Sequence, residues 1–167
     1  MKKICATAVF LMLMTASVSM AGAWQTTLFV CGENNGGVYQ QEMTLGVAEE
    51  AEVLPAPPVP PLYSVNASLF NADWAPLWKD IRPDGKTSYE WIIGVDPHGN
   101  TGTPASEGTC TLTWGTFQMG KGTYELRQGS DGKGEILIPD MKNVTSFKVS
   151  GKAKKQYFTI VYVPEVK

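Results

Sequence analysis

Histidine is almost absent from this sequence of 167 residues, and its one occurrence, His98, stands in the turn-like segment Asp-Pro-His-Gly-Asn. Nucleophilic hydrolysis needs a nucleophile beside a positioned base, and no G-x-S-x-G or comparable motif accompanies this histidine. Zinc sites need clustered cysteine and histidine ligands, which one histidine and three cysteines do not supply. We therefore expect His98 to be an exposed loop residue and the protein to have no cofactor, no metal and no enzymatic activity. A hydrolase, with His98 as the first residue to test, is the second alternative.

Long apolar runs are missing after residue 23, where no stretch approaches the roughly 18 apolar residues that span a bilayer. The beginning of the chain differs, because Lys2 and Lys3 precede an apolar run over residues 8–15 and a small-residue cleavage pattern. We expect residues 1–23 to be a signal peptide for the general secretory route. Residues 24–167 are then expected to form one exported domain, periplasmic or extracellular, that does not span a membrane.

Basic residues are also few and scattered. The expected signal peptide holds two of the 14 basic residues and none of the 16 acidic ones, which leaves 12 and 16, a net charge of about −4. Nucleic acids and anionic lipids are bound by basic stripes. We therefore expect no nucleic-acid partner, and the oligomeric state stays open.

Cysteine is sparse, and Cys5 would leave with the signal peptide. The remaining pair, Cys31 and Cys110, would reach an oxidising compartment. We expect a disulfide between them, which would close a loop of about 80 residues and stabilise the fold by about 4–5 kcal/mol. The alternative is two separate buried thiols that act as small apolar side chains.

Helical periodicity is scarce after residue 23, and short runs of strand-like residues take its place. They are bounded by Gly, Pro, Asn or Asp, and together they predict an all-β fold, an antiparallel immunoglobulin-like β-sandwich of about seven to nine strands. A barrel is the structural alternative. The expected strands are Trp24–Cys31, Val38–Val47, Tyr63–Phe70, Ser88–Asp96, Thr109–Trp114, Thr123–Arg127, Glu135–Ile138, Val144–Val149 and Gln156–Val163. The first two could pair, residues 128–134 predict a hairpin turn, and residues 151–155 predict a turn between the last two.

Two segments do not fit this strand pattern. Residues 54–62 contain five prolines, which lack an amide donor and fix φ, so we expect a rigid extended connector along an edge of the fold. Recognition of this segment by an aromatic groove is the alternative. Residues 71–86 are expected to be an apolar loop that packs onto the body.

The best candidates for a ligand or partner surface lie in that expected loop. Trp74 and Trp78 are four residues apart and stand beside Asp80 and Arg82. Exposed indole rings next to polar groups suit stacking on sugars or anchoring of a protein partner. The alternative is that both rings close one end of the fold and that Asp80 and Arg82 form a structural ion pair, worth about 0–1 kcal/mol at a surface.

The acidic residues suggest one metal to consider, which is calcium. Asp73, Asp80 and Asp84 share the expected loop, and Asp131 lies in another turn. None of them follows the EF-hand spacing. We expect turn residues or surface charges at these positions.

A family resemblance rests on the order of several short motifs. They are the Pro-rich 54–61, Trp78-Lys79-Asp80-Ile81-Arg82, the strand around Trp91, Thr111-Leu112-Thr113-Trp114, Tyr124-Glu125-Leu126, Asp140-Met141 and Phe158-Thr159-Ile160-Val161-Tyr162. In this order the chain resembles small exported bacterial proteins with an immunoglobulin-like or fibronectin type III-like β-sandwich. The resemblance implies a non-enzymatic structural, spacer or recognition role at the cell envelope or outside the cell, with an envelope or extracellular protein or glycan as the partner. A carbohydrate-binding domain that uses Trp74 and Trp78 is the first alternative.

Overall fold

The computed structural model describes residues 22–34, 37–58, 65–97, 108–151 and 154–165. The expected signal peptide therefore lies outside the described residues up to residue 21, and so does His98. Both interpretations stay predictions. In the described ranges, no helix combines the length and the apolar character that a bilayer crossing requires.

The described chain is all-β, as the sequence predicts. Apart from one short 3-10 turn at Thr116–Gln118, its regular elements are eleven strands. They are β1 (Trp24–Asn34), β2 (Gly37–Ala48), β3 (Glu52–Pro55), β4 (Asn66–Phe70), β5 (Pro76–Pro83), β6 (Tyr89–Asp96), β7 (Gly108–Trp114), β8 (Gly122–Gln128), β9 (Ile136–Ile138), β10 (Ser146–Gly151) and β11 (Gln156–Pro164). Each of the nine expected runs overlaps one of these strands, with residues 63–64 of the third run outside the described residues, and β3 and β5 are additional.

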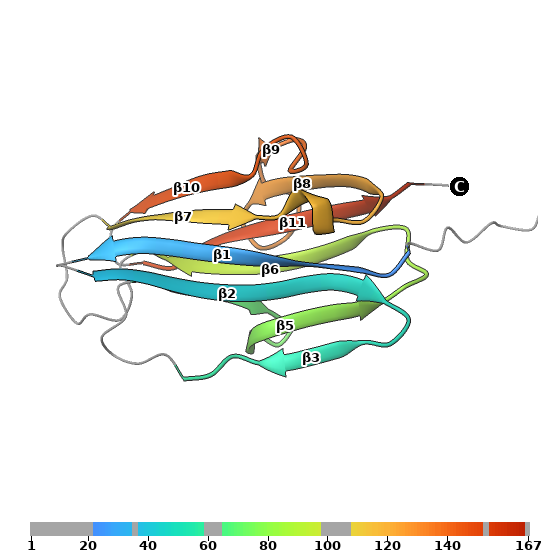
Figure 1. Cartoon of the computed structure of the whole chain (residues 1–167), viewed down its shortest axis with the longest axis horizontal. Helices are drawn as coiled ribbons and strands as arrows, with labels where there is room; N and C mark the ends of the chain where they lie inside the picture. The colour runs from blue at the N-terminus through green and yellow to red at the C-terminus, as the bar shows by residue number, and fades with distance from the viewer. Residues whose placement is uncertain (1–21, 35–36, 59–64, 98–107, 152–153, 166–167) are drawn as a thin grey trace, which may run out of the picture.

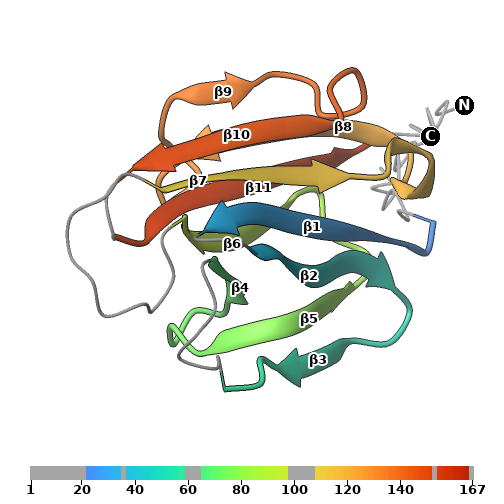
Figure 2. The ribbon, with the colours of Figure 1, turned by 60° about the vertical axis from the view of Figure 1, so that its left-hand side comes forward.

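All eleven strands belong to one sheet, with the order β10-β7-β1-β2-β5-β4-β6-β11-β8-β9 and with β3 paired to β5. The sheet curls on itself, so that its β7–β1–β2 half lies across the core from its β6–β11–β8 half (Figures 1 and 2). The pairs are antiparallel except for β2 and β5, which run parallel. The structure therefore has one continuous curled sheet, where the sandwich prediction implies two separate ones.

Aromatic side chains fill one end of the core. The ring of Trp24, at the start of β1, makes edge-to-face contacts with Trp91, Tyr124 and Tyr162, at centroid distances of 5.8, 5.2 and 5.1 Å. Aromatic pairs in this geometry stabilise a core beyond the area that they bury. Because these rings come from opposite halves of the sheet, their contacts hold the curl closed.

The pairing of the last strands corrects one prediction. β1 and β2 pair as expected, and β8 and β9 form the expected hairpin. β10 and β11, which the sequence suggested as hairpin neighbours, do not pair with each other: β10 pairs with β7, and β11 pairs with β6 and β8. The two strands instead face each other across the core, where the rings of Phe147 and Phe158 meet edge-to-face at 5.5 Å.

The expected disulfide is absent, and the register gives the reason. Cys31 and Cys110 are free thiols on the neighbouring strands β1 and β7. Cys31 is opposite Thr111 and Cys110 is opposite Gly32, so the two cysteines occupy successive positions along the ladder. Residues directly opposite share a face and successive residues alternate. Cys110 therefore points into the core and Cys31 points out of the sheet, so no bond can join them without a rearrangement of these strands.

We accordingly predict that unfolding the protein without reductant exposes both thiols to a thiol reagent. Cys31→Ser should change the free energy of unfolding by less than about 0.5 kcal/mol, because Cys31 lies on the outer face. The measurements are a thiol count in denaturant and urea unfolding. No reactive thiol at these two positions, together with a loss of about 4–5 kcal/mol in Cys31→Ser, would restore the disulfide.

Three buried side chains, Cys110, Tyr124 and Tyr162, carry protons that they lose at alkaline pH, so the stability of the fold should depend on pH in that range. Burial raises the pKa of Tyr124, with a further contribution from Tyr162, and burial also raises the pKa of Tyr162. Burial, with smaller contributions from Asp96 and Cys31, raises the pKa of the Cys110 thiol to about 12. Because each folded pKa lies above the unfolded one, the stabilisation is complete below the unfolded pKa and is lost as the pH rises above it.

We predict that raising the pH above about 8.5 lowers the free energy of unfolding, first through Cys110 and then, above about pH 10, through the two tyrosines. Each titrating group adds a slope of about 1.4 kcal/mol per pH unit. Urea unfolding at pH 8, 9.5 and 10.5 measures the slope, and Tyr162→Phe should reduce it. A constant free energy of unfolding between pH 8 and 10.5 contradicts the assignment.

Candidate functional site

Strand β5 replaces most of the expected loop over residues 71–86, and it carries a bulge at Trp78. Prolines stand at its two ends, Pro76 and Pro83, where the absence of an amide donor is tolerated. Its neighbour β3 matches Leu54 to Lys79 and then Pro55 to Leu77, which leaves Trp78 as the extra residue. A bulge bends its strand and redirects the side chain at that position.

The sheet forks at this bulge. β3 occupies one edge of β5, so the strands that pair with the other edge must share it. β2 takes that edge from Lys79 to Pro83, and β4 takes it at Pro76 and Leu77. β2 and β4 therefore separate at Trp78, and the two halves of the curled sheet diverge from this point.

One side chain bridges the fork. The backbone N–H of Ala67 on β4 donates a hydrogen bond of 2.6 Å to Oε1 of Gln41 on β2. In a continuous sheet, a backbone carbonyl of the neighbouring strand would accept this bond. The glutamine amide satisfies the donor and holds the two strands at the width of the fork.

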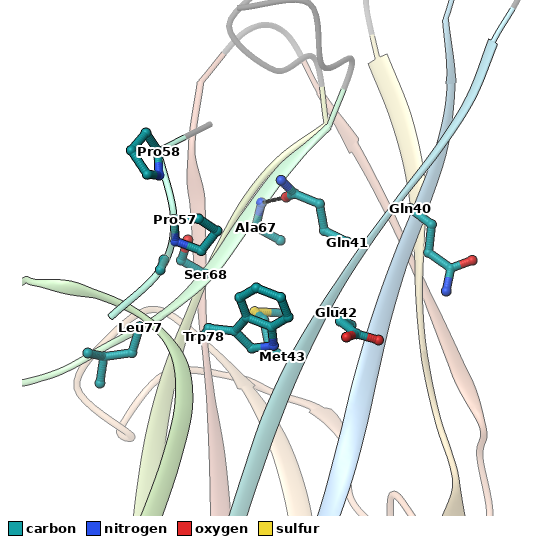
Figure 3. Close-up of a pocket in the computed structure, with 11 residues that line it drawn as sticks. Gln40, Gln41, Glu42, Met43, Pro57, Pro58, Ala67, Ser68, Leu77 and Trp78 are labelled. Carbon is teal, nitrogen blue, oxygen red and sulfur yellow. Dashed lines mark hydrogen bonds between the residues drawn. The ribbon is translucent and has the colours of Figure 1, made fainter. Parts of the chain in front are cut away.

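A pocket of about 400 Å³ lies in the fork (Figure 3). We call it the fork pocket. It is lined by β2, by β4, by the start of β5 and by the chain that follows β3, and the lining residues are Gln40, Gln41, Glu42, Met43, Ala56, Pro57, Pro58, Ala67, Ser68, Leu77 and Trp78. Its volume is in the range of small-ligand sites.

The lining of the fork pocket combines an aromatic and aliphatic surface with a few polar groups. Trp78 is 41% exposed, and its indole ring, the Met43 side chain and the rings of Pro57 and Pro58 all contribute to the lining (Figure 3). Among the described lining residues, Glu42 is the one charged side chain and extends from β2 on the side away from Ala67 (Figure 3), Ser68 supplies one hydroxyl, and there is no histidine, cysteine, lysine or arginine. Such a surface can stack against a ligand and form hydrogen bonds with it.

Trp74 lies in a different environment from Trp78. It is half exposed, and its ring contacts Phe70 at 6.0 Å and Tyr157 at 5.1 Å, with Lys155 placed over Phe70 at 4.9 Å. Its φ of +60° makes it the one positive-φ residue other than glycine in the described ranges. A bulky residue in this region is strained.

The side chain of Asn71 holds the strained turn. Its Oδ1 accepts hydrogen bonds from the backbone N–H groups of Asp73 and Ala75, at 3.1 and 2.8 Å.

The two candidate tryptophans stand in separate surroundings. Trp74 lies in the aromatic cluster with Phe70 and Tyr157, and Trp78 lines the fork pocket.

Asp80 and Arg82 form the ion pair that the sequence suggested as the alternative, and the pair lies inside the fold. Nε and Nη2 of Arg82 both donate to Oδ2 of Asp80, at 3.1 and 3.0 Å, and the guanidinium lies 5.2 Å from the centre of the Trp91 ring. The Asp80 side chain is only 8% exposed. The bulge shifts the alternation of β5 by one residue. Asp80 and Arg82 therefore point to the inner face of the sheet, toward Trp91, and away from the surface proposed from sequence.

The remaining acidic candidates are dispersed. Oδ1 of Asp131 accepts the N–H of Lys133 within a turn, as expected of a turn residue. Asp73 is exposed and Asp84 is partly buried, each in its own turn. Across the described ranges, no three His, Cys, Asp or Glu side chains gather closely enough to hold a metal ion.

Comparison with protein-family models, with curated proteins and with solved structures finds no match for this chain. The class that the fold and the site define is therefore an all-β protein with a single curled sheet and a pocket where that sheet forks.

Proposed function

We propose that this chain is an exported, non-enzymatic recognition module that acts at the cell envelope or outside the cell and binds its partner in the fork pocket. The observation that carries this proposal is the bulge that places Trp78 in a pocket of about 400 Å³ between diverging strands. Export rests on the signal-like residues 1–23. The proposal also holds that the two facing halves of the curled sheet correspond to the two layers of an immunoglobulin-like sandwich, joined into one sheet through β5.

The chemistry of the lining favours binding over catalysis. Within the described part of the lining, Glu42 is the one carboxylate, and Ser68 has no histidine or lysine beside it there. Hydrolysis by general acid and base catalysis needs two titratable groups whose surroundings give them different pKa values. Trp78, in contrast, is an aromatic side chain of the type that dominates recognition surfaces.

Carbohydrate binding is the second candidate, and the environment of Trp74 favours it. This indole is half exposed, its backbone is strained, and Tyr157 lies beside it. Strained residues concentrate where a fold presents a side chain for function. The two candidates are separable, because each depends on a different tryptophan.

The test is a screen of the protein against a glycan array and a displayed library of random peptides, repeated with Trp78→Ala and Trp74→Ala. We expect a ligand whose affinity falls at least about 30-fold in Trp78→Ala, the effect of losing one dominant anchor of about 2 kcal/mol. Trp74→Ala should change that affinity less than about twofold. A sugar whose binding depends on Trp74 alone would favour the second candidate, and an absence of any ligand would contradict both.

A further inference from the structure

Two strand edges face the fork pocket without a strand partner among the described residues. β2 pairs with β1 along its whole length, but its other edge pairs with β5 only from Thr44 onward. β4 pairs with β6 along its whole length, but its other edge pairs with β5 only at Leu69 and Phe70. Open edges of this kind are templates for an additional strand.

The main chain of β2 contributes to the pocket wall. Figure 3 shows the side chains of Gln40 and Glu42 extending from β2 on the side away from Ala67 and the prolines. Both residues nevertheless line the pocket. At these two positions β2 therefore presents its peptide groups, which are the groups that pair with an extended chain.

Gln41 occupies the place of a strand at one position. Its side-chain carbonyl accepts the Ala67 N–H, which points into the fork. A backbone carbonyl of an added strand could accept the same bond, and the glutamine amide could then turn to solvent. A side-chain bond of this kind is worth about 1 kcal/mol net, so a ligand that makes several main-chain bonds can displace it.

Charge indicates the side chains that such a strand would carry. Glu42 is exposed, it is the one charged residue among the lining residues that the structure describes, and none of the ion pairs found in the described ranges includes it. Side chains directly opposite on neighbouring strands stand on the same face. A lysine or arginine on the added strand could therefore lie beside Glu42, and the acidic net charge of the protein favours a basic segment.

We propose that the fork pocket binds an extended, basic peptide segment of a partner protein, which adds as a strand between β2 and β4 and takes the Ala67 N–H from Gln41. An apolar side chain of the segment packs on Trp78 and Met43. The inference rests on the proposed function, because it names the ligand class of the same pocket. β-Strand addition is a recurring mode of peptide recognition, in which main-chain bonds give affinity and alternate side chains give specificity.

The first test uses the peptide that dominates selection from a displayed library of random 12-residue sequences, made synthetically. N-methylation of one residue at a time removes single backbone donors. Since the donors of an inserted strand point alternately to the neighbour on each side, here β2 and β4, we expect methylation to weaken binding at least tenfold at successive positions of a central segment and to have little effect at the ends of the peptide. Uniform insensitivity of that segment to methylation overturns strand addition.

The second test changes the protein. Gln41→Ala removes the competing acceptor, so the peptide should bind about fivefold more tightly, the conversion of about 1 kcal/mol. Glu42→Gln should weaken binding about threefold at low salt and less at high salt. Weaker binding in Gln41→Ala would make Gln41 a ligand contact and overturn its displacement.

Failure of this inference is distinguishable from failure of the proposed function. A glycan that binds in a Trp78-dependent manner, with no peptide selected, would overturn strand addition and leave the recognition pocket in place. A peptide whose affinity is the same for the wild-type protein and Trp78→Ala would overturn both.

Discussion

Replacing Trp91 by alanine is expected to lower the free energy of unfolding by about 4 kcal/mol, as for other large-to-small changes of a buried aromatic residue. Trp91 is completely buried and its Nε1 donates to the backbone carbonyl of Asp80 at 3.0 Å. Its ring contacts Trp24 edge-to-face at 5.8 Å and stacks on Tyr89 at 5.9 Å. The change removes links among β1, β5 and β6 together.

Trp91→Phe is the matched variant, because it keeps most of the volume and loses the indole donor. We expect it to cost about 1–2 kcal/mol, the effect of one lost hydrogen bond and a small cavity. Urea unfolding at pH 7 measures both variants. A loss below about 1 kcal/mol in Trp91→Ala would mean that the ring is not in the core. Against a total of about 5–15 kcal/mol for a typical domain, the expected loss is large.

Asp80→Ala is expected to have the second largest effect, a loss of about 2–3 kcal/mol. The carboxylate is buried, whereas the Arg82 side chain keeps 26% exposure, so the unpaired guanidinium is only partly relieved by water. Breaking a fully buried pair costs about 3–5 kcal/mol and an exposed pair about 0–1. The expected value lies between these limits and above the surface value that the sequence suggested.

The chain contains a matched control for this pair. On β8, Arg127 donates through Nε and Nη2 to Oε2 of Glu125, at 2.8 and 2.5 Å, with the same two-residue spacing. The Glu125 side chain is 30% exposed, however, so Glu125→Ala should cost less than about 1 kcal/mol. Equal losses in Asp80→Ala and Glu125→Ala would contradict the buried placement of Asp80. Adding Arg82→Met to Asp80→Ala should recover part of the loss.

The sequence predicts the strands that alternate and fails at the two that do not. β3 is exposed along its whole length and ends at Pro55, so it has no buried face to detect. In β5 the bulge at Trp78 interrupts the period of two, and the buried face beyond it carries Asp80 and Arg82. Charged residues and prolines indicate a loop. Here they form a strand, because the charges of Asp80 and Arg82 pair with each other and the two prolines stand at the ends of the strand.

The candidate site was predicted only in part for the same reason. Trp78 was recognised from its residue type, but Gln41 and Ala67 carry no signal in the sequence, since their contact depends on how β2 and β4 separate at β5. The expected Cys31–Cys110 disulfide failed because compartment and count say nothing about register. A one-residue offset between β1 and β7 places the two thiols on opposite faces.

Backbone amide shifts, recorded during titration with the selected ligand, test most directly the claim that the fork pocket is the recognition site. The account predicts that the largest shifts fall on Gln41, Met43, Ala67 and the amide and indole N–H groups of Trp78, which line the fork. Trp74 and Tyr157, which form the separate aromatic cluster, should change little. Shifts centred on Trp74 and Tyr157, with the fork unchanged, would contradict the account.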